Sequence, residues 1–256
     1  MKIETNNINP VDISRLVASD VHAIHIRSFV QPDVAVQLSE KIMGRGYARY
    51  ENAPSIGRIG MAFYEAEGRP DRMTKYFDQA GRHVEELRDR CFPYQSPIDV
   101  LRCRLDEIWP AGAMLESLYG KKMYVGLSRV LEPEVTFLAH HDIFAKDAPD
   151  SFRAHGLEAQ IACNVYLNMP DGGGDLHIWT HEIPPDEFDE MRGDSYGIDP
   201  KLLGEPHLTI QPEQGDLVLF NSRLMHAVAP GKSRPRLSLS CFVGYRGAAS
   251  PLTFWS

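Results

Sequence analysis

The chain has 256 residues and a formal net charge of -8, with 43% hydrophobic and 24% charged residues. These values are typical of one large globular domain with an ample core. The acidic balance argues against a nucleic-acid partner, because phosphate contacts need clustered Lys and Arg. No apolar stretch approaches the roughly 20 residues that span a bilayer, and residues 1–7 lack the apolar core of a signal peptide.

The first 120 residues are predicted to be mainly helical and to pack on the core that follows. A short strand is expected over residues 21–27, and Pro32 then begins a helix that runs to about Met43. Further helices are expected over residues 70–91 and 97–109, and a short one ending at residues 119–120. These segments show the amphipathic pattern of surface helices.

From Lys121 the pattern changes to short strands separated by Gly and Pro turns. Helices followed by such strands predict an all-β core, a β-sandwich or jelly roll, flanked by N-terminal helices within a single domain, residues 1–256. The core should cover residues 121–246, with strands at 122–131, 135–141, 157–168, 174–180, 207–212, 216–221 and 236–245.

The connection at residues 182–206 is unusually long for a sandwich loop and predicts a lid-like insertion. It holds eight acidic residues against Arg192 and Lys201. A merely solvated acidic loop is an equally good interpretation. If the insertion is a lid, its charge favours a cationic or amine-bearing substrate.

Four cysteines, Cys91, Cys103, Cys163 and Cys241, are scattered without paired spacing. Cys163 and Cys241 lie in apolar strand patterns, which is typical of buried thiols rather than of disulfide partners. We therefore expect reduced cysteines and a cytoplasmic location.

The most informative residues are His140, Asp142 and His226. Two imidazoles and one carboxylate form the ligand set that holds a non-haem ferrous ion on one face of its octahedron and leaves three positions open. His140 and Asp142 end a β-branched and aromatic run, as at the rim of a strand, and His226 follows an apolar strand that opens at Gly215-Asp216. His141, between them, should point away from the metal. The alternative is that both histidines are ordinary residues at strand ends.

Arg236 begins the last long strand and is the candidate for binding a 2-oxo acid. A period of two places Arg236, Ser238 and Ser240 on one face, with Leu237 and its apolar neighbours on the other. A guanidinium and a hydroxyl two residues apart on one face can bind one carboxylate together. Arg234 is the weaker candidate, since the following Pro235 keeps it in the loop.

Three aromatic residues near the expected mouth of the jelly roll could line a substrate pocket: Phe137, Phe144 and Trp179. Plain core packing is the more common role for such side chains.

These motifs resemble the iron(II)- and 2-oxoglutarate-dependent oxygenases with a double-stranded β-helix core. The likeness covers residues 120–246 most strongly, including the Gly-Gly-Gly-Asp-Leu turn at 172–176 and the Gly-Asp-Leu-Val-Leu-Phe-Asn run at 215–221. It implies that His140, Asp142 and His226 bind Fe(II) and that Arg236, with Ser238, binds the distal carboxylate of 2-oxoglutarate, dioxygen being the other co-substrate.

More narrowly, the chain looks like the carrier-protein-independent aliphatic halogenases, which act on indole alkaloids or free amino acids, and their hydroxylating relatives. The halogenases have Gly or Ala where this chain has Asp142, which leaves room for chloride on the metal. The resemblance therefore implies hydroxylation of an unactivated C–H bond in a small molecule, an amino acid or an amine-bearing natural-product intermediate.

Other function classes stay open on the sequence alone. A cupin-type iron dioxygenase or isomerase would use the same metal ligands without 2-oxoglutarate, although Arg236 counts against it. A non-catalytic sensor could bind a small acid in the same mouth. A peptide hydroxylase would need a basic partner to match the acidic chain. Succinate release and turnover of amine or amino-acid substrates discriminate between these classes.

Overall fold

Two sheets face each other in the computed structural model, which describes residues 1–51, 53–66 and 68–256. The larger sheet is built around the antiparallel pair β10 (Ala159–Asn168) and β15 (Arg236–Tyr245). Among the described residues it has ten strands, and its main path runs β1 (Lys2–Thr5), β2 (Ala23–Ile26), β13 (Leu217–Asn221), β10, β15, β8 (Leu127–Leu131), β4 (Ile56–Ile59) and β3 (Ala48–Arg49). β16 (Leu252–Trp255) pairs with β15 and with β5 (Ala113–Leu115).

The smaller sheet carries much of the candidate site. Its order is β12 (Leu208–Ile210), β11 (Leu176–Ile178), β14 (His226–Val228) and β9 (Phe137–His140). A separate hairpin joins β6 (Ser117–Leu118) to β7 (Lys121–Lys122). Two sheets enclosing a common interior form a double-stranded β-helix, or jelly roll, as the sequence predicts.

Proline at the first turn marks the start of the longer helices, because its fixed φ suits that position and its missing N–H leaves no bond unmade. These helices are α1 (Pro10–Val17), α2 (Pro32–Gly44), α3 (Pro70–Cys91), α4 (Pro97–Ile108) and α7 (Pro185–Arg192). Shorter ones are η1 (Phe63–Ala66), α5 (Phe144–Asp147), α6 (Phe152–His155) and η2 (Pro200–Leu203). In the described part of the chain, no helix combines the length and apolar character needed to cross a membrane.

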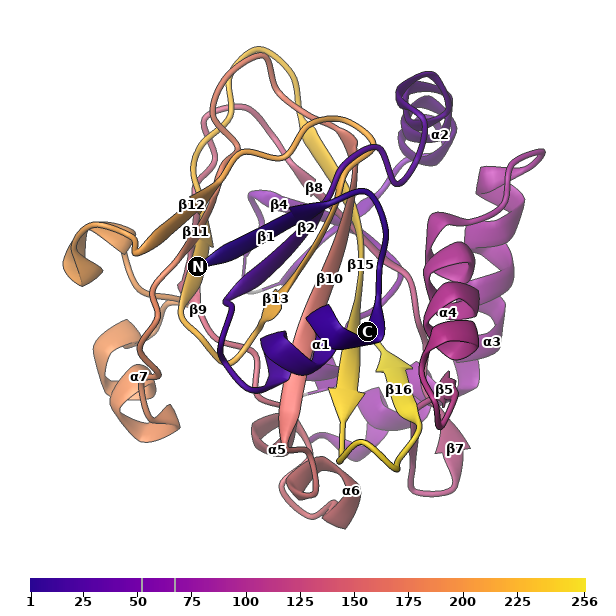
Figure 1. Ribbon diagram of the computed structural model, residues 1–256. Coiled ribbons are helices and arrows are strands. Elements are labelled where there is room, and N and C mark those ends of the chain that lie inside the picture. The colour runs from indigo at the N-terminus through magenta and orange to yellow at the C-terminus, as the bar shows by residue number, and fades with distance from the viewer. Residues whose placement is uncertain (52, 67) are drawn as a thin grey trace.

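The alternation along β15 divides the molecule into two compartments. Leu237, Leu239, Cys241 and Val243 pack into a core with α1, α2, α3 and α4. Arg236 and Ser238, on the opposite face, line the interior between the two sheets. Helices α3 and α4, joined by the Arg88–Asp99 ion pair, lie on one side of the molecule, and α7 lies on the other (Figure 1). The site is therefore enclosed by the sheets and bordered by the insertion.

Most expected elements are confirmed, but two features of the first 120 residues differ from prediction. The short helix expected before residue 120 is wrong: that segment forms β5 and β6. Its Ala-Met-Leu sequence favours a helix locally, yet parallel pairing with β16 determines the observed conformation. The N-terminal region also contributes β1, β2, β3 and β4 to the large sheet, so it does more than cover the core with helices.

All four cysteines are free thiols, in agreement with the sequence, and Cys163 lies opposite Cys241 in the β10–β15 pair.

Candidate metal centre

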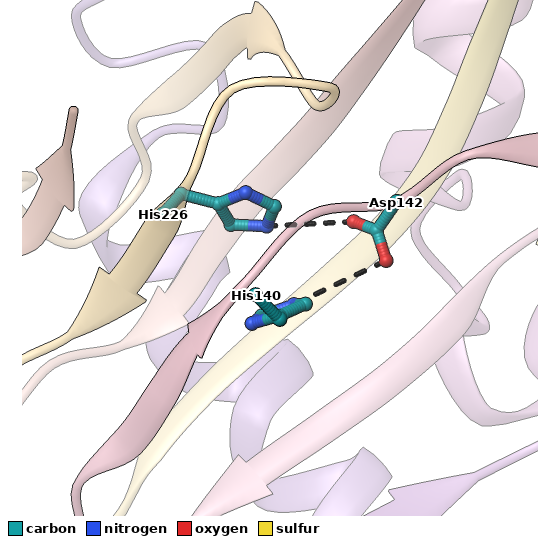
Figure 2. A group of neighbouring side chains, drawn as sticks. All are labelled: His140, Asp142 and His226. Atoms are coloured by element: carbon teal, nitrogen blue, oxygen red, sulfur yellow. Dashed lines mark ion pairs between the residues drawn. The ribbon is translucent and has the colours of Figure 1, made fainter. Parts of the chain in front are cut away.

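The ends of two neighbouring strands bring His140, Asp142 and His226 together. His140 is the last residue of β9 and His226 is the first of β14, and the two lie directly opposite each other in the antiparallel register. Asp142 follows two residues after His140, where its backbone N–H donates to the Ser222 carbonyl at 2.8 Å. All three side chains point toward one another (Figure 2).

The spacing of these side chains suits a single metal ion. The Asp142 carboxylate lies 3.4 Å from Nε2 of His226 and 4.0 Å from Nε2 of His140. One candidate ligand atom from each residue lies within 4.8 Å of the others. Metal–ligand bonds of about 2.1 Å place neighbouring octahedral ligands roughly 3 Å apart. Small side-chain shifts would therefore bring the three residues onto one ion.

Backbone carbonyls fix the tautomer of both histidines. Nδ1 of His140 donates to the Leu138 carbonyl at 2.9 Å, and Nδ1 of His226 donates to the Leu224 carbonyl at the same distance. Because a carbonyl oxygen only accepts, each Nδ1 must carry the proton. Each Nε2 then presents its lone pair to the centre, which is the arrangement that supports a metal-ligating histidine.

The local electrostatics favour the protonation states that a cation needs. Burial, reinforced by the neighbouring His226, lowers the pKa of His140 to about 3, so this imidazole is neutral at pH 7. For Asp142, burial acts to raise the pKa, but the contact with His226 and the proximity of His140 outweigh it and hold the pKa below its usual value. A neutral imidazole and a carboxylate are both ready to bind a metal.

Arg236 lies buried beside this centre. It is 5% exposed, and its guanidinium lies 4.8 Å above the Tyr166 ring. Its Nε has no hydrogen-bond partner, and the described residues place no Asp or Glu within ion-pair distance of it. Ser238, the predicted second contact for a 2-oxo acid, lines the same cavity. An orphaned cation in this position fits the carboxylate of a small acid such as 2-oxoglutarate.

A second cation, the half-buried Arg129, was missed by the sequence analysis. It lies on β8 opposite Ser238, and one guanidinium nitrogen donates to Oγ of Ser240 at 2.8 Å. Its Nε also lacks a hydrogen-bond partner. It lines the interior together with the three candidate ligands. The sequence did carry a signal, since Arg129 interrupts the apolar strand Leu-Ser-Arg-Val-Leu.

The three aromatic candidates have different roles. Phe137 lines the interior near His140, as predicted, with the two ring centroids 4.7 Å apart. Phe144 and Trp179 are each 1% exposed and belong to packed cores, so the prediction that they line the pocket is wrong. Phe144 stacks on Trp255 at 4.4 Å, and Trp179 donates its indole N–H to the Gly204 carbonyl. Both side chains pack in buried clusters, and neither lines the cavity.

A larger cavity of about 410 Å³ opens on the far side of His140 and Asp142. The insertion borders it with Phe188, Arg192 and Tyr196. His141 also lines this cavity and packs against Phe188 at 4.3 Å between ring centroids. It stays outside the ligand cluster, in agreement with the sequence prediction.

Comparison with known proteins identifies relatives among oxygenases. The family described as the 2OG-Fe(II) oxygenase superfamily matches residues 125–244. The L-gamma-glutamyl-L-propargylglycine hydroxylase of Streptantibioticus cattleyicolor is 30% identical over 162 residues, which is 62% of this chain and 59% of that protein. The L-isoleucine 3(1)-dioxygenase of Pantoea ananatis is 32% identical over 118 residues, which is 43% of this chain and 39% of that protein. The matched region thus spans less than two thirds of either relative.

A solved structure gives the same fold over nearly the whole chain. The N-substituted L-amino acid dioxygenase of Burkholderia ambifaria, in complex with alpha-KG, superposes with a TM-score of 0.62 over 96% of this chain and 90% of that one, at 17% identity. At that identity the likeness describes the fold. The family match over residues 125–244 includes all three candidate metal ligands and Arg236, so the part of the chain that carries the candidate site is similar to the 2OG-Fe(II) oxygenase superfamily.

Proposed function

We propose that the protein is an Fe(II)- and 2-oxoglutarate-dependent dioxygenase that hydroxylates an unactivated C–H bond of a small molecule. The observation that carries this proposal is the occurrence of a three-residue ligand cluster and an unpaired buried cation in one interior. His140, Asp142 and His226 each offer a ligand atom within 4.8 Å of the others, and within the described residues no Asp or Glu pairs with the neighbouring buried Arg236.

In this proposal His140, Asp142 and His226 hold the iron. Their lone pairs already face a common point, because backbone carbonyls bind the opposite nitrogen of each histidine. The carboxylate of Asp142 would be the third ligand of the iron, where the halogenases have Gly or Ala and leave room for a halide. This supports hydroxylation over halogenation.

Arg236 and Ser238 bind the distal carboxylate of 2-oxoglutarate. The guanidinium supplies a planar fork of donors and the serine hydroxyl a further one. Arg129 donates to Ser240 through one nitrogen and lines both the inner and the outer cavity. We assign it a positioning role between the co-substrate and the substrate.

When bound, iron and 2-oxoglutarate together supply the oxidising chemistry that activates dioxygen. The residues of the chain orient the reactants and limit water in the site. Phe137 and Phe220 line the interior and shield one side of the centre. Because burial keeps His140 neutral at pH 7, a proton does not compete with the metal for its imidazole nitrogen.

The substrate class that we propose is an amino acid or a small amino-acid derivative. The two curated relatives are named for the hydroxylation of a dipeptide and for the oxidation of an amino acid, which supports this class. The cavity of about 410 Å³ beside the centre lies within the range that small-molecule ligands occupy.

Turnover with heavy-isotope dioxygen tests the proposal. The protein would be incubated with Fe(II), 2-oxoglutarate and a panel of amino acids and γ-glutamyl dipeptides. We expect succinate, together with one labelled oxygen atom in the product. An oxidised product without succinate would contradict the proposal and indicate an oxygenase that does not use 2-oxoglutarate.

We also propose that residues 1–256 act as one domain. The N-terminal strands β2 and β4 pair with β13 and β8, so the core sheet includes strands from both halves of the chain.

A further inference from the structure

The larger cavity contains a carboxyl group that no part of the metal chemistry uses. Asp147 is the last residue of α5 and lines the cavity that also borders His140 and Asp142. Within the described residues, its side chain has neither an ion-pair nor a hydrogen-bond partner. Burial, with the charge of Asp142 as a second cause, raises its pKa to about 8. The carboxyl is thus held in a place that disfavours its charge.

The nearby cations are already bound to a different carboxylate. Nζ of Lys146 lies 2.7 Å from Oδ1 of Asp189, and Nε of Arg192 lies 2.7 Å from the same oxygen. Both cations also lie over the Phe188 ring, at 5.2 and 5.9 Å. This arrangement connects α5 to the insertion, and within the described residues no cation forms an ion pair with Asp147.

His141 presents a second unpartnered polar group to the same cavity. It is 8% exposed, and neither ring nitrogen has a hydrogen-bond partner. A buried imidazole without partners carries a desolvation cost that a bound polar ligand would relieve. An imidazole without hydrogen-bond partners and a carboxyl without an ion-pair partner among the described residues therefore line one cavity next to the metal centre.

The aromatic part of the cavity wall suits a cationic group, and the cations Arg129, Lys146 and Arg192 line other parts of the wall with Asp142 and Asp147. Tyr50 and Tyr64 stack with their ring centroids 6.0 Å apart, and Tyr196 lines another side. Aromatic faces attract ammonium groups through their quadrupole. The part of the insertion that lines the cavity, Phe188, Arg192 and Tyr196, contains no acidic residue. The acidic surface of the insertion is therefore a poor explanation for selecting a cationic substrate.

We infer that this cavity selects a substrate with a free ammonium group, that Asp147 binds this ammonium, and that His141 hydrogen-bonds an adjacent polar atom of the substrate. This inference rests on the proposed function, because it places the substrate beside the metal ligands. Substrate selection then depends on Asp147 of α5 and on His141, the residue next to His140.

Binding of matched probes to Asp147→Asn tests the inference. The probes are the twenty L-amino acids, a set of γ-glutamyl dipeptides and the N-acetylated counterpart of each. Binding is measured without oxygen by calorimetry, on protein loaded with Fe(II) and 2-oxoglutarate. Asp150→Asn is the matched control, because Asp150 is exposed and lies three residues further along the chain.

We expect at least one free amine to bind wild type, with its N-acetylated form binding roughly 10–100-fold more weakly, as for the loss of a hydrogen bond between charged groups. Asp147→Asn should weaken the binding of the free amine by a similar factor and leave the affinity for the N-acetylated form unchanged. Asp147→Glu should recover part of the affinity, and Asp150→Asn should behave as wild type.

Three results would overturn the inference: equal binding of free and N-acetylated probes to wild type, undiminished binding of the free amine to Asp147→Asn, or no ammonium-bearing probe binding at millimolar concentration. The charge-transfer absorbance of the Fe(II)–2-oxoglutarate complex, recorded before any probe is added, tests the proposed function separately. If this absorbance appears in both wild type and Asp147→Asn but the binding results contradict the inference, only the assignment of Asp147 is wrong.

Discussion

Replacing Arg236 with leucine should produce two opposite effects, one on ligand binding and one on stability. The guanidinium can form two charge-assisted hydrogen bonds with one carboxylate, each contributing about 1.5–3 kcal/mol. Their loss amounts to roughly 3–6 kcal/mol, or about 10²–10⁴-fold in the Kd of 2-oxoglutarate. In the ligand-free protein, however, Arg236 is a cation that is 5% exposed and has no carboxylate partner.

The same substitution should therefore stabilise the ligand-free fold. Removing an unpaired buried charge is favourable, whereas losing the contact with Tyr166 at 4.8 Å costs about 0.5–2 kcal/mol. We expect a net gain of about 1 kcal/mol, which raises Tm by roughly 2–4 °C in a chain of this size. The combined pattern distinguishes a ligand-binding cation from a structural one.

Calorimetry with 2-oxoglutarate and with pyruvate is the assay, because pyruvate lacks the distal carboxylate. Wild type should prefer 2-oxoglutarate strongly, and Arg236→Leu should lose most of that preference. Arg234→Leu is the matched control: Arg234 is exposed and pairs with Asp171 at 3.3 Å. If Arg236→Leu still discriminates between the two acids as wild type does, the carboxylate does not bind at Arg236.

Three further predictions concern carboxylates. Asp142→Ala should abolish hydroxylation and weaken metal binding by at least 10-fold, measured by metal titration. Full activity of this variant would show that Asp142 is not an iron ligand. Asp216, which accepts from His25 at 2.7 Å and from the Ser28 N–H at 2.9 Å, has a pKa held below its usual value by the His25 contact despite burial. The contribution of the charged Asp216 to stability is complete above about pH 4 and is lost as the pH falls further. Asp216→Asn should therefore lower the free energy of unfolding in urea by about 2–4 kcal/mol at pH 7 and by less in acid. Equal losses of stability at both pH values would contradict this. For Asp147, whose pKa is raised to about 8, the folded state binds the extra proton, so stability falls as the pH rises from about 4 to 8. Asp147→Asn should therefore raise Tm of the metal-free protein at pH 8 and leave it unchanged at pH 4, and the reverse order would refute the burial argument.

The cluster of candidate metal ligands could be predicted from the sequence because the chemistry and the local pattern of its residues agree. His140 and Asp142 follow a recognisable strand, and His226 follows another, so the rims of two strands were implied before any pairing was known. The alternation of Arg236 with Leu237 also specified which side chain faces the interior. These inferences needed only a period of two and the ligand preferences of iron.

The remaining features depend on contacts between distant segments. The helix expected before residue 120 is replaced by β5, because its strand partner β16 lies near the other end of the chain. Phe144 was one of three candidates for the pocket, yet it packs against Trp255, also a distant residue. The unpartnered state of Asp147 depends on Asp189 binding Lys146 and Arg192, a contact that no local pattern encodes.

The most direct test of the account is an anaerobic titration of the metal-free protein with Fe(II) and then 2-oxoglutarate, recording the visible charge-transfer absorbance of the chelate. His226→Ala is compared with His177→Ala, a histidine on the adjacent strand β11 that lies outside the ligand cluster. We expect the charge-transfer band in wild type and in His177→Ala, and its loss in His226→Ala. No band in wild type, or an unchanged band in His226→Ala, would contradict the assignment of this centre.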